Sequence, residues 1–224
     1  MNPHTSDPEG FARHQVVDRQ HQNLPVSTFL VPAGWRAESE VYWNYQHTNF
    51  PVVSRARVTN PAATEQFEFL PSEMFFWIEP DYGLYPRGGN VGGSYYLPPM
   101  SGADTLTRLV IPKYRGDRER LQITGAGPVP NLVLMLNARD LAALPYEGVT
   151  AKIEYAEQGR AMAEEFYACH IVNPMPPAYG PYGASQQTNW GFTRLFCFRA
   201  ERGRLDESRH LFWRIASSVV GDPR

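Results

Sequence analysis

The segment that most constrains the fold is residues 148–172, GVTAKIEYAEQGRAMAEEFYACHIV. Its first half alternates apolar residues with Thr, Lys and Glu, and the apolar positions are Val149, Ala151, Ile153 and Tyr155. A period of two predicts a strand with one buried and one solvated face. Glu157–Gly159 then supplies a turn, and a second strand is expected from Arg160 to Ile171. The segment therefore predicts a long antiparallel hairpin.

The N-terminal third repeats this strand pattern in shorter runs. A first strand is expected from Val26 and ends at Pro32, because proline cannot donate to a sheet ladder. Further runs follow at residues 38–46, 51–59 and 65–71. Turn residues separate the runs, so we expect an antiparallel meander.

Helix signals occur at three places. Ser101 followed by Asp104 forms a capping box, and Pro112 is expected to end that helix at Ile111. A second helix is predicted over residues 131–141. The last is amphipathic, with apolar residues at helical spacing: Leu205, Phe212, Ile215 and Val219. Strand runs with a few helices predict the α+β class, an antiparallel β-sheet flanked by helices.

The chain is long enough to form one domain with a core that needs no disulfide, since it has 224 residues. Residues 1–22 lack apolar periodicity and are expected to form a flexible N-terminal leader. No linker or internal repeat divides residues 23–221, so a single domain is expected there. Cys169 and Cys197 lie in apolar runs and are expected to be buried free thiols, with a disulfide between neighbouring strands as the alternative.

Charge and hydropathy exclude several classes of partner. The net charge of −2 does not indicate the basic surface that nucleic-acid binding requires. The basic run Lys113–Arg120 contains two acidic residues, which weaken it as a nucleic-acid site. No stretch approaches the roughly 18 apolar residues of a membrane span. The N-terminus is polar and lacks an apolar signal core. We therefore expect a soluble protein, cytoplasmic if the chain is complete and periplasmic if a signal was removed.

The sequence contains no match to the common catalytic and cofactor motifs. In GGNVGG, residues 88–93, Asn90 occupies the second glycine of a dinucleotide fingerprint, and no Lys-Ser/Thr follows as in a phosphate-binding loop. Cys169 and His170 are neighbours on a strand, so their side chains project to opposite faces. The histidines show no zinc-ligand spacing. We expect no catalytic residue, metal or cofactor, and an enzyme is the less favoured class.

Two long segments rich in Tyr, Pro and Gly, residues 78–100 and 173–189, are predicted to be loops. Loops this long in a compact domain are usually functional or disordered, and aromatic residues with few charges argue against disorder. Tyr and Trp make contact surfaces at low entropic cost. The candidate binding residues are Trp77, Tyr82, Tyr85, Arg87, Tyr95, Tyr96, Tyr179, Tyr182 and Trp190.

Three interpretations of these loops remain open. The first is a non-enzymatic binding or adaptor domain that contacts a protein or peptide partner through them. The second is a structural lid, in which the two loops pack on each other over one sheet face. The third is a small-ligand binder or enzyme with a cleft beneath the loops, which would use Glu73, Glu79, Arg87 or His170.

Two motifs carry a resemblance to a known family. VPAGW at residues 31–35 follows the first strand, and FRAERGRLDESRHLFWRIASSV at residues 198–219 closes the chain. With the meander between them, they resemble the Mog1/PsbP-like group, in particular bacterial DcrB-type proteins of unknown function. The resemblance covers residues 25–220. It implies an antiparallel sheet flanked by helices and an accessory, binding or chaperone-like adaptor role, with no catalytic residues to carry over.

Overall fold

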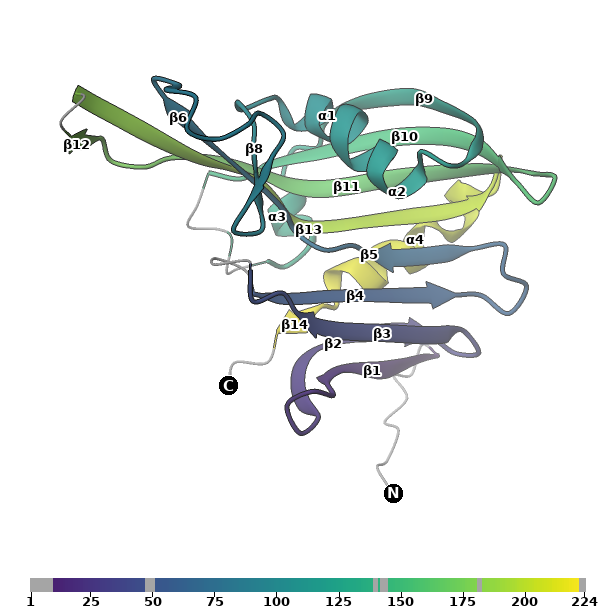
Figure 1. Ribbon diagram of the computed structural model, residues 1–224. Coiled ribbons are helices and arrows are strands. Elements are labelled where there is room, and N and C mark those ends of the chain that lie inside the picture. Colours follow the sequence, from purple (N-terminus) through teal and green to yellow (C-terminus); the bar gives the residue numbers. More distant parts are fainter. Residues whose placement is uncertain (1–9, 47–50, 139–140, 142–144, 181–182, 222–224) are drawn as a thin grey trace.

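The structure, a computed structural model, describes residues 10–46, 51–138, 141, 145–180 and 183–221 (Figure 1). Within these residues the chain is an α+β protein built on one large sheet and one small sheet. The large sheet has eleven strands. Its main path runs in the order β3 (Arg36–Trp43), β4 (Val52–Thr59), β5 (Gln66–Phe69), β13 (Gly183–Glu201), β11 (Arg160–Pro174), β10 (Glu147–Glu157) and β9 (Glu119–Pro128), and all neighbours on it are antiparallel.

The predicted hairpin is confirmed as β10 and β11. Glu157 pairs with Arg160, so the turn is formed by Gln158 and Gly159. Both turn residues have positive φ, 51° and 78°. Positive φ at both positions is typical of a two-residue type I′ turn, whose twist matches the right-handed twist of the two flanking strands. Local turn chemistry and period-two patterning therefore agree here, which is why the sequence identified this element correctly.

The segments predicted as loops are partly strands. β6 (Glu73–Glu79) pairs with residues 186–192 of β13, and β8 (Ser94–Tyr96) pairs in parallel with β6. Two short strands complete this region, β7 (Asn90–Val91) and β12 (Ala178–Gly180). The polar residues 186–189 were expected in a loop, but they form a strand because their backbone pairs with β6, and residues 188 and 189 also pair with β11, whatever their side chains. β11, β12 and β13 together form an arm that extends beyond the body of the sheet (Figure 1).

One helical segment follows the first of these regions. It comprises α1 (Gly102–Thr105), a π-helical turn η1 (Leu106–Val110) and α2 (Ile111–Arg115). The Ser101 cap is confirmed, since the Asp104 N–H donates to the Ser101 hydroxyl at 3.1 Å. The predicted end at Ile111 is wrong. The Ile111 N–H bonds back to Leu106, and Pro112 lies in the first turn of α2, where a missing N–H is tolerated.

The other helices differ in how well the sequence marked them. α4 (Leu205–Ser217) is confirmed as the closing amphipathic helix, with Phe212 and Ile215 buried. α3 (Leu132–Met135) is a single turn, so the helix predicted over residues 131–141 is wrong in length. In the described part of the chain, no helix is long and apolar enough to cross a membrane.

A small three-stranded sheet includes part of the segment where a flexible leader was expected. It consists of β1 (Phe11–Asp18), β2 (Leu24–Pro32) and β14 (Val220–Gly221). Phe11 and Val16 are buried, so the expectation of a leader is wrong from Phe11 onward. The register shifts between Val16 and Val17, where β2 carries the extra residue Val26. β1 itself is interrupted by three polar residues, 13–15, which leaves few apolar positions to reveal it as a strand.

The large sheet is covered on both faces. Figure 1 shows α1 and α2 on one face and α4 on the other. One apolar cluster lies between the sheet, α4 and the β1–β2 hairpin, and a second lies under α1, η1 and α2. Cys169 belongs to the first cluster and Cys197 to the second. The two cysteines therefore lie on opposite faces of the sheet and form no disulfide, so the disulfide alternative is wrong.

Candidate functional site

Three of the predicted binding residues are interior residues. The rings of Trp77 and Tyr96 stack with their centroids 4.7 Å apart, and both side chains are buried. Trp190 is buried as well, stacks on Phe75, and its indole N–H donates to the Leu97 carbonyl at 2.9 Å. In this conformation these three side chains stabilise the region and cannot contact a partner.

The next three residues surround this aromatic core. The Arg87 guanidinium lies 5.1 Å from the Trp77 ring centroid and pairs with Asp81 at 3.2 Å. Tyr85 packs on Tyr96, and Tyr95 is half-buried. These contacts are those expected of a lid that packs on itself.

The remaining predicted residues lie on the surface or outside the described part. Tyr82 is 49% exposed and Tyr179, on the arm, is 84% exposed. Tyr182 lies outside the described residues. Of the eight predicted residues that the structure describes, three are therefore buried, three surround them and two are surface tyrosines.

The cleft that was expected beneath the loops is a shallow hollow, lined by Trp77, Glu79, Pro80, Asp81, Pro177, Ala184, Ser185 and Gln186. Of the four polar residues expected there, only Glu79 lines it. Glu73 is buried and is held by Lys113 at 2.6 Å and by the Tyr114 hydroxyl. His170 is buried on another part of the sheet, near Glu147, and burial lowers its pKa. The structure does not gather these groups around one substrate position.

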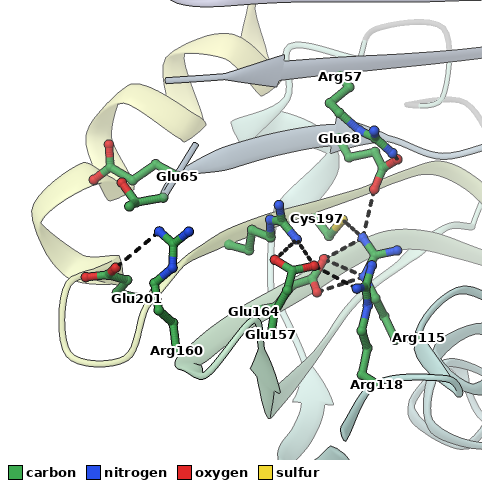
Figure 2. Close-up of polar contacts among 12 residues, drawn as sticks. Arg57, Glu65, Glu68, Arg115, Arg118, Glu157, Arg160, Glu164, Cys197 and Glu201 are labelled. Atoms are coloured by element: carbon green, nitrogen blue, oxygen red, sulfur yellow. Dashed lines mark hydrogen bonds and ion pairs between the residues drawn. The ribbon is translucent and has the colours of Figure 1, made fainter. Parts of the chain in front are cut away.

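A buried ion network joins α2 to the sheet (Figure 2). The Arg115 guanidinium donates to Glu164 at 2.7 Å and to Glu68 at 2.7 Å, and it approaches the Cys197 sulfur at 3.5 Å. The Glu164 side chain is fully buried, and Glu68 also accepts from Arg57 at 3.0 Å. Each carboxylate is thus neutralised by arginine. We interpret the network as a structural clamp, because no acid in it is left to take a proton from a substrate.

The network continues toward the β10–β11 turn. Glu157 accepts hydrogen bonds from Arg118 at 2.7 Å and from Arg199 at 2.8 Å. Within the part of the chain that the structure describes, no group of three or more His, Cys, Asp or Glu side chains is arranged to hold a metal ion.

A more enclosed pocket lies on the opposite face of the sheet, beside the β1–β2 hairpin. Its volume is about 470 Å³. The apolar part of its lining consists of Val16, Val26, Phe29, Val52, Val53, Ala56, Phe69, Leu70, Leu136, Leu141, Leu195, Phe196, Ala216 and Val219. The polar part consists of Ser27, Ser54, Arg55, Ser72, Tyr146, Thr193 and Arg194. Strands, helices and turns distant in the sequence contribute to it, which is why no local pattern revealed it.

The register of the sheet explains where the pocket lies. Ala56, Phe69 and Phe196 are directly opposite one another on β4, β5 and β13, and they form an apolar row. Beyond this row β5 ends, and β13 pairs with β6 only up to Phe192. Residues 193–195 therefore have no regular partner on that side, although the Leu70 N–H reaches the Leu195 carbonyl at 2.9 Å. The pocket opens at this discontinuity between β5 and β6.

Comparisons with known proteins do not assign the chain to a family. No family model matches it, and no curated protein sequence matches it. Among solved structures, it is similar to LpqN of Mycobacterium tuberculosis, whose structure is described as involved in cell envelope biogenesis. The identity is 12% and the TM-score 0.32, over 99% of this chain and 89% of that chain. A TM-score this low does not establish a common fold, so the pocket is interpreted from its own chemistry.

Proposed function

We propose that this protein is a non-enzymatic binding domain that takes a small, mostly apolar molecule into the pocket between the large sheet and the β1–β2 hairpin. The observation that carries the proposal is the pocket itself, with about 470 Å³ of space and two-thirds of its lining apolar. Ligand sites typically have 300–1,000 Å³, apolar walls and a few polar groups. Protein interiors are otherwise close-packed, so a space of this size beside buried phenylalanines is unusual for a purely structural core.

This proposal is tested by filling the pocket from α4. Ala216 is buried and lines the pocket, so Ala216→Leu adds three carbon atoms inside it. We expect the wild type to bind the neutral fluorophore N-phenyl-1-naphthylamine saturably, and the variant to bind it about tenfold more weakly because of steric exclusion. A fluorescence titration measures both affinities.

The matched control is His210→Leu, on the same helix but exposed and outside the pocket lining. It should bind the fluorophore as the wild type does. The proposal fails if the wild type shows no saturable binding, or if Ala216→Leu binds as tightly as His210→Leu.

A second candidate function is contact with a protein or peptide partner through the arm. The observation that favours it is the surface of the arm, where Val172, Met175 and Tyr179 are exposed and residues 173–189 contain no charged side chain. Exposed aromatic and Met side chains with few charges are typical of the centre of protein interfaces. This is the adaptor function expected from the sequence, now limited to the surface residues.

The arm is tested by Tyr179→Ser, compared with Tyr45→Ser, an exposed tyrosine elsewhere. If the arm binds a partner, a protein that co-purifies with the wild type should be lost with Tyr179→Ser and retained with Tyr45→Ser, at unchanged Tm. Equal recovery with both variants would rule out a role for Tyr179. Quantitative mass spectrometry of the purified samples gives the comparison.

We also propose that the chain has the Mog1/PsbP-like sandwich suggested by its two terminal motifs. The support is the antiparallel sheet with α1 and α2 on one face and α4 on the other. The residues of the VPAGW motif, 31–35, lie at the end of β2, where Trp35 packs edge-on against Phe212 of α4 at 6.1 Å between ring centroids. An experimental structure would test this topology directly.

A further inference from the structure

The polar part of the pocket lining consists mainly of neutral hydroxyl groups. The residues that carry them are Ser27, Ser54, Ser72, Tyr146 and Thr193. Three of these residues lie next to the apolar row that crosses β4, β5 and β13. Ser54 precedes that row on β4, Ser72 follows β5, and Thr193 belongs to β13. A molecule that fills the pocket would therefore meet hydrocarbon along most of its length and hydroxyl groups at one end.

The two arginines of the lining are engaged elsewhere. Arg55 follows Ser54 on β4, so its side chain projects to the opposite face of the sheet, where it pairs with Glu40 at 2.7 Å. Arg194, which lies in a bulge of β13 and has φ of 50°, already makes an interaction within the protein. Among the described residues, the lining contains no Asp, Glu, Lys or His. A charged ligand group would therefore lose its hydration in the pocket without gaining a free ionic partner, which is unfavourable.

One hydroxyl of the lining lacks a hydrogen bond. The Thr193 Oγ1 atom is buried and has no hydrogen-bond partner in the described part of the chain. A buried hydroxyl without a partner destabilises a protein, and such groups are rare in native structures. Because Thr193 lines the pocket, rotation about its Cα–Cβ bond turns the hydroxyl toward a ligand that supplies the missing bond. This end of the pocket therefore favours a ligand atom that donates or accepts a hydrogen bond.

We infer that the ligand of the pocket is an uncharged amphiphile, a hydrocarbon that carries a hydroxyl or carbonyl head group. Its head group binds at Ser54, Ser72 and Thr193, and its hydrocarbon part lies against the phenylalanines of the pocket. Serine and threonine hydroxyls both donate and accept, so they match either head group without a charge. This inference rests on the proposed function, since it specifies the ligand of the same pocket.

Three probes with the same hydrocarbon chain and different head groups test the inference: decanol, decanoate and decyltrimethylammonium. Each is measured at neutral pH by its displacement of N-phenyl-1-naphthylamine from the wild-type protein. We expect decanol to bind most tightly, and the anion and the cation each to bind roughly tenfold more weakly, because neither finds an ionic partner to offset its lost hydration.

The outcomes separate this inference from the proposed function. If the fluorophore itself does not bind saturably, the proposed function fails and the inference fails with it. If the fluorophore binds but decanoate or the cationic probe binds as tightly as decanol, the pocket remains a ligand site. In that case only the inference about an uncharged head group is overturned.

The role of the Thr193 hydroxyl is tested by Thr193→Val, which replaces the hydroxyl by a methyl group of similar size. We expect the affinity for decanol to fall roughly threefold to tenfold, as one hydrogen bond is lost. The affinity for 1-fluorodecane, which has no hydroxyl to donate, should stay unchanged. The Tm of the unliganded variant should not fall, because the substitution removes a buried hydroxyl that has no partner.

The matched control is Thr28→Val on β2, since Thr28 is half-buried and lies outside the pocket lining. It should bind both probes as the wild type does. Unchanged decanol binding in Thr193→Val would overturn the inference. An equal loss of decanol and 1-fluorodecane would overturn it too, since Thr193 would then only shape the pocket.

Discussion

Arg115→Met is expected to destabilise the protein by about 3–5 kcal/mol, the range observed when one partner of a buried ion pair is removed. Methionine keeps most of the length of the side chain and removes the charge. Glu164 would then be a fully buried carboxylate without its arginine, while Glu68 would keep its bond to Arg57. Urea unfolding at neutral pH measures the free energy of unfolding of each variant.

Arg108→Met is the matched control, because Arg108 lies on the same helical segment and pairs with Asp104, but is 70% exposed. An exposed pair of this kind contributes at most about 1 kcal/mol, so this variant should unfold nearly as the wild type does. The double variant Arg115→Met with Glu164→Leu should recover part of the stability, since it leaves no unpaired charge at that position. Equal effects of Arg115→Met and Arg108→Met would show that the network does not act as a clamp.

The elements predicted correctly are those with a complete local signal. Gln158 and Gly159 provide the turn and the alternation on either side provides the strands of the β10–β11 hairpin. The Ser101 cap depends on residues three apart in the sequence. α4 has both an apolar stripe and acidic residues in its first turn. In each case the interaction that decides the structure lies within a few residues, so the sequence was sufficient.

The elements missed depend on partners far away in the chain. β1 was missed because three polar residues, 13–15, interrupt it, and its burial depends on packing against β2 and α4. The polar start of β13 is a strand because β6, more than a hundred residues earlier, pairs with it. Arg115 belongs to the basic run Lys113–Arg120, yet it is buried and paired with Glu164 and Glu68 from two different strands. A single sequence does not contain such pairings as a pattern.

The candidate site shows the same division. The sequence indicated the aromatic segments because Tyr and Trp are conspicuous there, but Trp77, Tyr96 and Trp190 use their rings to pack against the protein itself. The pocket is formed instead by ordinary Val, Leu and Phe residues, and only the register of three strands brings them together. One signal near it, an arginine with positive φ, is a property of the folded backbone and could not be read from the sequence.

The stability of the protein is expected to fall by about 3 kcal/mol between pH 5 and pH 2 through Glu165 alone. Glu165 is buried on β11 and accepts hydrogen bonds from Arg209 of α4, from Lys152 and from the Tyr167 hydroxyl. Burial by itself would raise the pKa of this carboxyl, but the three donors outweigh burial and lower its pKa to about 2. In the unfolded chain the pKa returns to about 4.5. Between these two values the unfolded state binds more protons than the folded state, so stability is full above pH 4.5 and is lost as the pH falls toward 2.

Other carboxylates also titrate in this range, including Glu68, so the test is a difference between two proteins. Glu165→Gln cannot titrate at this position. Its free energy of unfolding should lie furthest below that of the wild type at pH 7, and the gap should shrink by about 3 kcal/mol by pH 2. Tyr167→Phe removes one of the three donors to Glu165 but keeps both cations. The pH range over which this variant loses stability in acid should therefore move to higher pH by less than one unit. A gap between the wild type and Glu165→Gln that stays constant from pH 7 to pH 2 would show that the ionised carboxylate does not hold α4 to the sheet.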